Sequence, residues 1–133
     1  MERFFLDTAY IQALLNARDD YHKQAAALFP RVRSAREVWV TEAVLIEVGN
    51  AFARSLREEA AGFIGRCYTT ANVRVVSVDT TLFTRALELY GQRADKAWSL
   101  TDCISFIVMQ DQQITDVLTM DEHFRQAGFR PLL

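Results

Sequence analysis

The sequence predicts an α/β fold of three layers, in which helices cover both faces of a central, mainly parallel sheet of four to five strands. Short apolar or β-branched runs alternate along the chain with longer stretches that have the apolar spacing of helices. Strands that alternate with helices pair in parallel, because each helix returns the chain to the same end of the sheet. The 133 residues include five glycines, two prolines and no Gly/Ser-rich linker, so we expect one domain, 1–133.

The first strand candidate is Phe4–Leu6, which stops at Asp7–Thr8, a pair suited to the start of a helix. Four later runs are also rich in apolar or β-branched residues. They are 37–40, 73–78, 116–119 and an edge strand at 130–133. The predicted helices mostly begin at a residue that can cap a helix. They cover 8–15, 20–30, 41–52, 57–70, 79–89, 101–109 and a short segment from residue 121.

The composition is typical of a folded, water-soluble protein, with 50% apolar and 24% charged residues, and it excludes a disordered chain. No stretch is long and apolar enough to cross a membrane, and Asp7 interrupts the N-terminal apolar run too early for a signal peptide. Cys67 and Cys103 lie in apolar helical patterns without metal-ligand spacing, so we expect reduced thiols and a cytoplasmic protein.

The net charge of −2 does not indicate the broad basic surface of many nucleic-acid-binding proteins. This observation counts less against a nuclease if several acids gather in one cluster, since a bound divalent cation would reverse the local field.

Acidic residues fall where the predicted sheet would present a ligand site. Asp7 and Asp121 each follow a strand candidate, and ligands of parallel sheets bind beyond the carboxyl ends of the strands. Asp102 lies at a helix start, where the helix dipole favours a carboxylate. Each of the three has a simpler explanation as a helix cap, so the prediction rests on the set.

Glu47 has the weakest alternative explanation. It shares a helix face with Val44 and Val48, and an ionised carboxylate is seldom kept on an apolar face without a partner or a metal. The alternative is a salt bridge to Arg54 or Arg57. Side chains on a helix lean towards its N-terminus, so Glu47 would reach back towards the strand ends.

Four acids that converge on one crevice, without a cluster of Lys or Arg to neutralise them, require cations. Hard oxygen ligands without a cysteine or a spaced histidine pair indicate Mg²⁺ or Mn²⁺ and not zinc. Ions held in this way suit phosphodiester hydrolysis by a metal-activated water. No Ser/His/Asp or Cys/His set indicates a covalent intermediate.

Four segments, taken in order, resemble the PIN-domain family. They are Phe5-Leu6-Asp7-Thr8, Glu47-Val48-Gly49-Asn50, Thr101-Asp102-Cys103-Ile104-Ser105 and Leu118-Thr119-Met120-Asp121-Glu122-His123-Phe124. They span nearly the whole chain and are similar to the VapC-type toxins of bacterial type II toxin–antitoxin pairs. The resemblance implies a PIN-like α/β/α fold, a Mg²⁺- or Mn²⁺-dependent endoribonuclease acting on RNA, homodimers and inhibition by a cognate antitoxin. It also implies that the metal is bound by Asp7, Glu47, Asp102 and Asp121.

The same resemblance places further polar side chains beside the acids. Thr8 and Thr119 would orient the acids or hold water, and Asn50 and Ser105 fall on polar positions near the site. Three cations are candidate contacts for RNA phosphates at the crevice rim: Arg93, Lys96 and Arg125.

Two aromatic side chains and one histidine near these segments receive other interpretations. Trp98 precedes Asp102 in a loop and is a candidate for stacking on an RNA base. Phe124 is expected in the core. His123 is expected to lie exposed on a helix surface and not to bind metal, because no second ligand flanks it.

Other classes of protein fit parts of the pattern. A response-regulator receiver needs an acidic pair after its first strand and a late lysine, whereas Asp7 has no acidic neighbour and no lysine follows Lys96. A phosphohydrolase similar to haloacid dehalogenases needs a second aspartate where this chain has Ala9. A PIN-like housekeeping RNA-processing nuclease, or a catalytically silent PIN-like binding module, would carry the same segments.

Overall fold

The computed structural model describes residues 2–133, so Met1, which the predicted domain includes, lies outside it. Its five-stranded sheet has the order β3-β2-β1-β4-β5, and every neighbouring pair is parallel. The strands are β1 (Arg3–Leu6), β2 (Glu37–Thr41), β3 (Val73–Val76), β4 (Asp116–Leu118) and β5 (Arg130–Pro131). The predicted fold class and the five strand candidates are confirmed, with β3, β4 and β5 ending earlier than expected.

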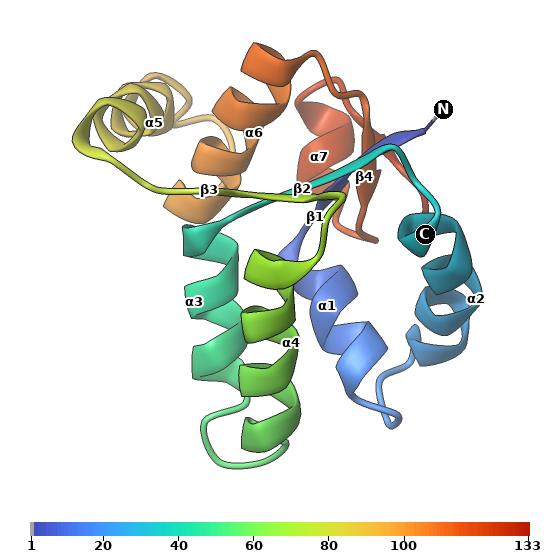
Figure 1. Cartoon of the computed structure of the whole chain (residues 1–133). Coiled ribbons are helices and arrows are strands. Elements are labelled where there is room, and N and C mark those ends of the chain that lie inside the picture. Colours follow the sequence, from blue (N-terminus) through green and yellow to red (C-terminus); the bar gives the residue numbers. More distant parts are fainter. Residues whose placement is uncertain (1) are drawn as a thin grey trace.

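Helices connect the strands on both sides of the sheet. They are α1 (Thr8–Leu15), α2 (His22–Arg33), α3 (Glu42–Ala51), α4 (Arg57–Thr69), α5 (Thr80–Gln92), α6 (Leu100–Gln112) and α7 (Glu122–Gln126). Figure 1 shows α1 to α4 on one face of the sheet and α5 to α7 on the other. Within residues 2–133, none of these helices has the length and hydropathy to cross a membrane.

The direction in which the chain winds changes between β1 and β4. From β1 the chain moves outward to β2 and β3, with α1 to α4 as the connections (Figure 1). It then returns through α5 and α6 to β4, beside β1, and moves to β5 on the opposite edge. The chain therefore leaves β1 and β4 in opposite directions along the sheet, and open parallel sheets bind ligands beyond the carboxyl ends of such strands.

The apolar residues of β1 and β4 explain why both strands lie in the interior of the sheet and not at its edges. Phe4, Phe5 and Leu6 are all buried, as are Val117 and Leu118 of β4. A strand that is apolar at successive positions needs cover on both faces, and only the inside of a three-layer sheet supplies it. Helix α6 is buried at every residue from 102 to 109, as its apolar pattern predicts.

Side-chain caps set several helix starts as expected. Thr41 accepts a hydrogen bond from the amide of Val44 (3.2 Å), and Asp79 accepts one from Leu82 (2.8 Å).

Helix α2 differs from the prediction at both ends. The helix was expected to start at Asp20, but it begins two residues later, at His22. The Asp19 carboxylate accepts the Tyr21 amide (2.9 Å) and holds residues 19–21 in a turn. Pro30 does not end the helix, which continues to Arg33. Proline has no amide donor, but the last turn of α2 buries Val32 against the core, and this burial offsets the missing bond.

Candidate metal centre

The pairing of β1 with β4 brings two of the predicted acids to one place. Asp7 directly follows β1, and Asp121 lies three residues after β4. The two strands are in register at Leu6 and Leu118, and the Asp7 amide donates to the Leu118 carbonyl at 3.2 Å. Residues far apart in sequence thus leave the sheet side by side.

Asp7 is a buried carboxylate. Its side chain makes no cap bond to α1, although the residue occupies the N-cap position, so the capping explanation does not apply. Only 5% of the residue is exposed. The pKa of its carboxyl is raised from 3.8 to about 7, mainly because burial disfavours the charged form. The hydrogen bond from Thr119 opposes this rise, and the negative charges of Asp102 and Asp121 add to it.

Thr119 connects the two acids. Its hydroxyl donates to Asp7 Oδ2 at 2.8 Å and accepts the Asp121 amide at 3.0 Å, and the residue is fully buried. One side chain therefore fixes the Asp7 carboxylate and the turn that carries Asp121.

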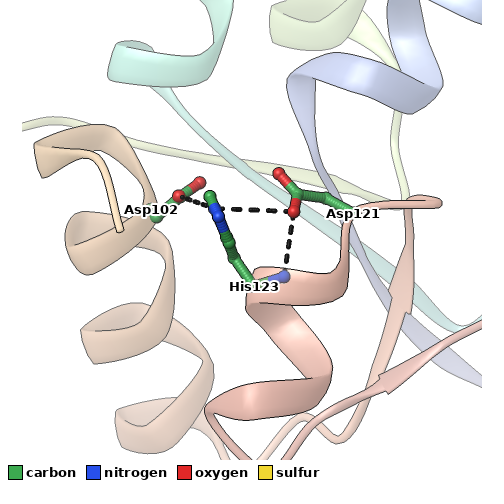
Figure 2. Close-up of side chains that lie close together, drawn as sticks. All are labelled: Asp102, Asp121 and His123. Atoms are coloured by element: carbon green, nitrogen blue, oxygen red, sulfur yellow. Dashed lines mark hydrogen bonds and ion pairs between the residues drawn. The ribbon is translucent and has the colours of Figure 1, made fainter. Parts of the chain in front are cut away.

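The third acid comes from α6. Asp102 and Ser99 form a capping box, in which Ser99 Oγ accepts the Asp102 amide (2.9 Å) and Asp102 Oδ2 accepts the Ser99 amide (3.0 Å). Asp102 is buried and faces Asp121 across the imidazole of His123 (Figure 2). Ligand atoms of Asp102, Asp121 and His123 all lie within 4.8 Å of one another.

The prediction that His123 lies exposed on a helix surface, away from the acids, is wrong. Its side chain is 29% exposed, and Nδ1 lies 2.9 Å from Asp102 Oδ2 and 3.5 Å from Asp121 Oδ1. Asp121 caps α7 by accepting the His123 amide at 2.9 Å, which sets the first turn and aims the ring back at the acids (Figure 2). In the sequence, the spacing Asp121-Glu122-His123 after a strand candidate could have indicated that this histidine lies near the acids.

Glu47 extends from α3 to Thr8. Its Oε1 accepts the Thr8 hydroxyl at 2.7 Å, and Thr8 directly follows Asp7. Within residues 2–133 no ion pair joins Glu47 to Arg54 or Arg57, so the salt-bridge alternative is wrong, and both arginines are exposed. Glu47 stands outside the tight group of Asp102, Asp121 and His123.

The remaining polar candidates lie in varied surroundings. Asn50 is exposed on α3, one turn beyond Glu47. Ser105 is fully buried on α6, and its hydroxyl has no hydrogen-bond partner within residues 2–133. Their roles beside the acids stay predictions.

Two of the three cations predicted to contact RNA phosphates already lie close to acidic side chains of this chain. Arg93 pairs with Asp95 (3.0 Å) and lies over the Trp98 ring at 4.9 Å. Arg125 lies 3.6 Å from Glu122, and Lys96 is half-buried. Their contact with RNA stays a prediction.

Trp98 itself belongs to the core and does not present a free face to RNA. It is 7% exposed, packs edge-on against Phe106 at 5.0 Å and donates from Nε1 to Gln126 at 3.0 Å. Phe124 is fully buried, as expected.

The donor set fits a hard divalent cation. Carboxylates from the ends of β1 and β4 and from the start of α6 lie close enough for the charges of Asp102 and Asp121 to act on Asp7. Among residues 2–133 no Lys or Arg forms an ion pair with any of the three. Oxygen ligands of this kind suit Mg²⁺ and Mn²⁺, and Mn²⁺ also accepts an imidazole nitrogen such as that of His123. Burial is the main cause of the raised pKa of Asp7, and the charges of Asp102 and Asp121 add to it; a bound cation would oppose both effects by favouring the ionised form.

Comparisons with known proteins agree with the geometry. The PIN-domain family model matches residues 4–130. The 23S rRNA-specific endonuclease VapC20 of Mycobacterium tuberculosis is 30% identical over 125 residues, which are 94% of either chain. Its crystal structure, titled a sarcin–ricin loop cleaving toxin, has a TM-score of 0.87 at 28% identity, over 97% of this chain and 98% of that one.

More distant structures share the fold. FitAcB from Neisseria gonorrhoeae has a TM-score of 0.64 at 14% identity and covers 98% of this chain and 96% of its own. VapBC2 from Rickettsia felis, bound to a DNA fragment from the promoter, has a TM-score of 0.63 at 12% identity, with 95% and 93% covered.

These matches define the class of protein: the chain is a PIN-domain protein and belongs to a family of endonucleases. Among its relatives it is similar to the VapC-type toxins, with VapC20 matched along nearly its whole length.

Proposed function

We propose that this chain is a Mg²⁺- or Mn²⁺-dependent endoribonuclease, acting as one domain, and the toxin of a toxin–antitoxin pair. The observation that carries the proposal is the cluster of acids at the carboxyl ends of β1 and β4. Asp102 and Asp121 lie within one group of possible ligand atoms, and the buried Asp7, whose pKa is raised to about 7, experiences the charges of both. The similarity to a 23S rRNA-specific endonuclease supports RNA as the substrate.

Each side chain has a proposed role that follows from its surroundings. Asp7, Asp102 and Asp121 hold the metal, and Glu47 completes the site from α3 through its bond to Thr8. Thr119 orients Asp7, and Thr8 orients Glu47. When bound, the ion supplies Lewis-acid chemistry, which activates water and stabilises charge on the phosphodiester.

The substrate class follows from the similarity to VapC20, whose names specify 23S rRNA and the sarcin–ricin loop. A structured ribosomal RNA hairpin is therefore the first substrate to test. Because VapC-type toxins form half of a pair, we also propose a cognate antitoxin as a partner and the cytoplasm as the location.

The proposal includes a homodimer, supported by exposed apolar side chains on α3 and α5. Ile46 is 63% exposed, Phe83 40%, Leu87 47% and Tyr90 49%, and Ile46 and Phe83 line one cavity of about 380 Å³. Neighbouring exposed apolar groups mark surfaces that associate. A Leu87→Glu variant should shift the mass measured by light scattering from dimer to monomer, and a monomeric wild type would refute this part.

The direct test is cleavage of a 23S rRNA hairpin with Mg²⁺ or Mn²⁺, with and without EDTA. Cleavage should require the ion and should fall by at least about 100-fold in Asp7→Asn, because a metal ligand is lost. Asp111→Asn is the matched control, since Asp111 lies on the surface in a pair with Arg85 (2.6 Å). Cleavage that persists in EDTA or in Asp7→Asn would refute the mechanism.

A further inference from the structure

A hollow lies between α1, the segment before α2 and Met120, and none of the roles above uses it. It has a volume of about 450 Å³, within the range of roughly 300–1,000 Å³ typical of small-ligand sites. Helix α1 supplies Ala9 and Gln12, and Met120, which follows β4, also lines it. The loop before α2 supplies the remaining lining residues, Arg18, Asp19, Asp20 and Tyr21.

Two residues that line the hollow are sequence neighbours of residues in the metal centre. Ala9 directly follows Thr8, which bonds Glu47, and Met120 directly precedes Asp121. An RNA strand that is bound at the acids can therefore reach this hollow with a neighbouring nucleotide. The inference rests on the proposed ribonuclease function to this extent.

The groups in the hollow match the parts of a nucleotide. Tyr21 is 42% exposed and offers an aromatic ring, and every RNA base has a π-face that stacks on such a ring. The exposed guanidinium of Arg18 suits a backbone phosphate. The amide of Gln12 can donate to or accept from a base edge. The carboxylates of Asp19 and Asp20 repel phosphate, so this part of the hollow favours a base over the backbone.

The loop that carries Tyr21 is held in place before any ligand arrives. Asn16 Oδ1 accepts the Arg18 amide (3.1 Å), and Asp19 Oδ1 accepts the Tyr21 amide (2.9 Å). His22 Nδ1 lies 2.8 Å from the Ala13 carbonyl oxygen and ties the start of α2 to α1. A ring on a constrained backbone loses little entropy on stacking, so more of the contact energy remains for binding.

We propose that this hollow, the Tyr21 pocket, binds an unstacked RNA base next to the phosphodiester at the acids. Tyr21 stacks on the base, and Arg18 contacts a neighbouring phosphate. The pocket thus selects RNA with an unpaired nucleotide at the cleavage point, because a base held in a duplex cannot reach the ring.

The test compares Tyr21→Leu and Tyr21→Phe with Tyr68→Leu. Tyr68 is the matched control, since it is 56% exposed and lies on α4, outside the pocket. The probe is a fluorescein-labelled RNA hairpin with an unpaired loop. Binding is followed by anisotropy in EDTA, cleavage is followed in Mg²⁺, and thermal melts check that each variant folds and responds to Mg²⁺.

Tyr21→Leu should weaken RNA binding and raise KM by about 5- to 150-fold, with kcat and the Mg²⁺-induced melting shift unchanged. Tyr21→Phe and Tyr68→Leu should stay within about twofold of wild type, because phenylalanine keeps the π-face.

Equal effects of Tyr21→Leu and Tyr68→Leu, or none, would overturn the pocket even where Asp7→Asn abolishes cleavage. A wild type that binds the hairpin but never cleaves it would overturn the proposed activity alone, and the anisotropy comparison then decides on the pocket. A wild type that does not bind the hairpin would overturn the pocket as well.

Discussion

Replacing Asp7 with asparagine should stabilise the metal-free protein at alkaline pH while removing its activity. Burial raises the pKa of the Asp7 carboxyl from 3.8 to about 7, so the folded state prefers the protonated form. Stability from this preference is present below about pH 4 and is lost as the pH rises to about 7. Asparagine resembles the protonated acid in shape and has no charge to lose.

The magnitude follows from the shift. About three pH units at 1.36 kcal/mol each make about 4 kcal/mol at pH 8. Burial of the new amide N–H groups offsets about 2 kcal/mol, which leaves a gain of about 2 kcal/mol, or roughly 8 °C in Tm. At pH 5 the ionisable Asp7 costs wild type only about 1.6 kcal/mol of folding stability. This cost is close to that of burying the asparagine amide, so wild type and Asp7→Asn should have nearly equal stability at pH 5.

The assay is thermal and urea unfolding of EDTA-treated wild type and Asp7→Asn at pH 5 and pH 8. Asp111→Asn is the control of opposite sign, because Arg85 holds the pKa of the Asp111 carboxyl below its usual value and its loss should slightly destabilise. Saturating Mg²⁺ should raise the Tm of wild type and not of Asp7→Asn. Equal stability of wild type and Asp7→Asn at pH 8, or a gain of the same size at both pH values, would refute the account of Asp7.

Three further variants probe the neighbours of the acids. Thr119→Val should destabilise the fold by about 1–3 kcal/mol in urea, because Asp7 Oδ2 loses its donor and the Asp121 amide its acceptor; a neutral effect would contradict that. Ser105→Ala should be neutral or stabilising by up to about 1 kcal/mol, because the hydroxyl is buried without a partner among residues 2–133; weaker Mg²⁺ binding would instead assign it to the metal centre. His123→Ala should lower Mn²⁺ affinity more than Mg²⁺ affinity in calorimetry, since imidazole suits the softer ion, whereas equal losses would mean that the ring only orients the acids.

The unexpected position of His123 shows what local sequence patterns cannot predict. The sequence places the histidine two residues after an acid at a strand end, which is also a common surface position. Whether the ring turns inward depends on the first turn of α7, which Asp121 sets by capping the His123 amide. The partner that it meets, Asp102, lies 21 residues earlier on another helix. The local Asp-x-His spacing marks the histidine, but it does not show that the ring turns inward to meet Asp102.

The helix boundaries show the same limit on a smaller scale. Two adjacent aspartates precede α2, and either one suits a turn or a cap. The fold uses Asp19 for the turn, so the helix starts two residues after Asp20. Propensity ends the helix at Pro30, but burial of Val32 against the core extends it to Arg33. Packing is worth more than the single missing amide bond.

The sequence by itself determined the fold class and the positions of the acids at strand and helix ends, because alternation, apolar runs and capping residues are local patterns. Parallel pairing then implied that Asp7 and Asp121 would meet. Only the tertiary structure decided how buried each acid is, and that Thr119 bonds a carboxylate 112 residues away. It also placed Tyr21 in a hollow beside Met120. Burial, pKa and pockets depend on contacts between distant segments, which form only when the sheet and both helical layers have packed.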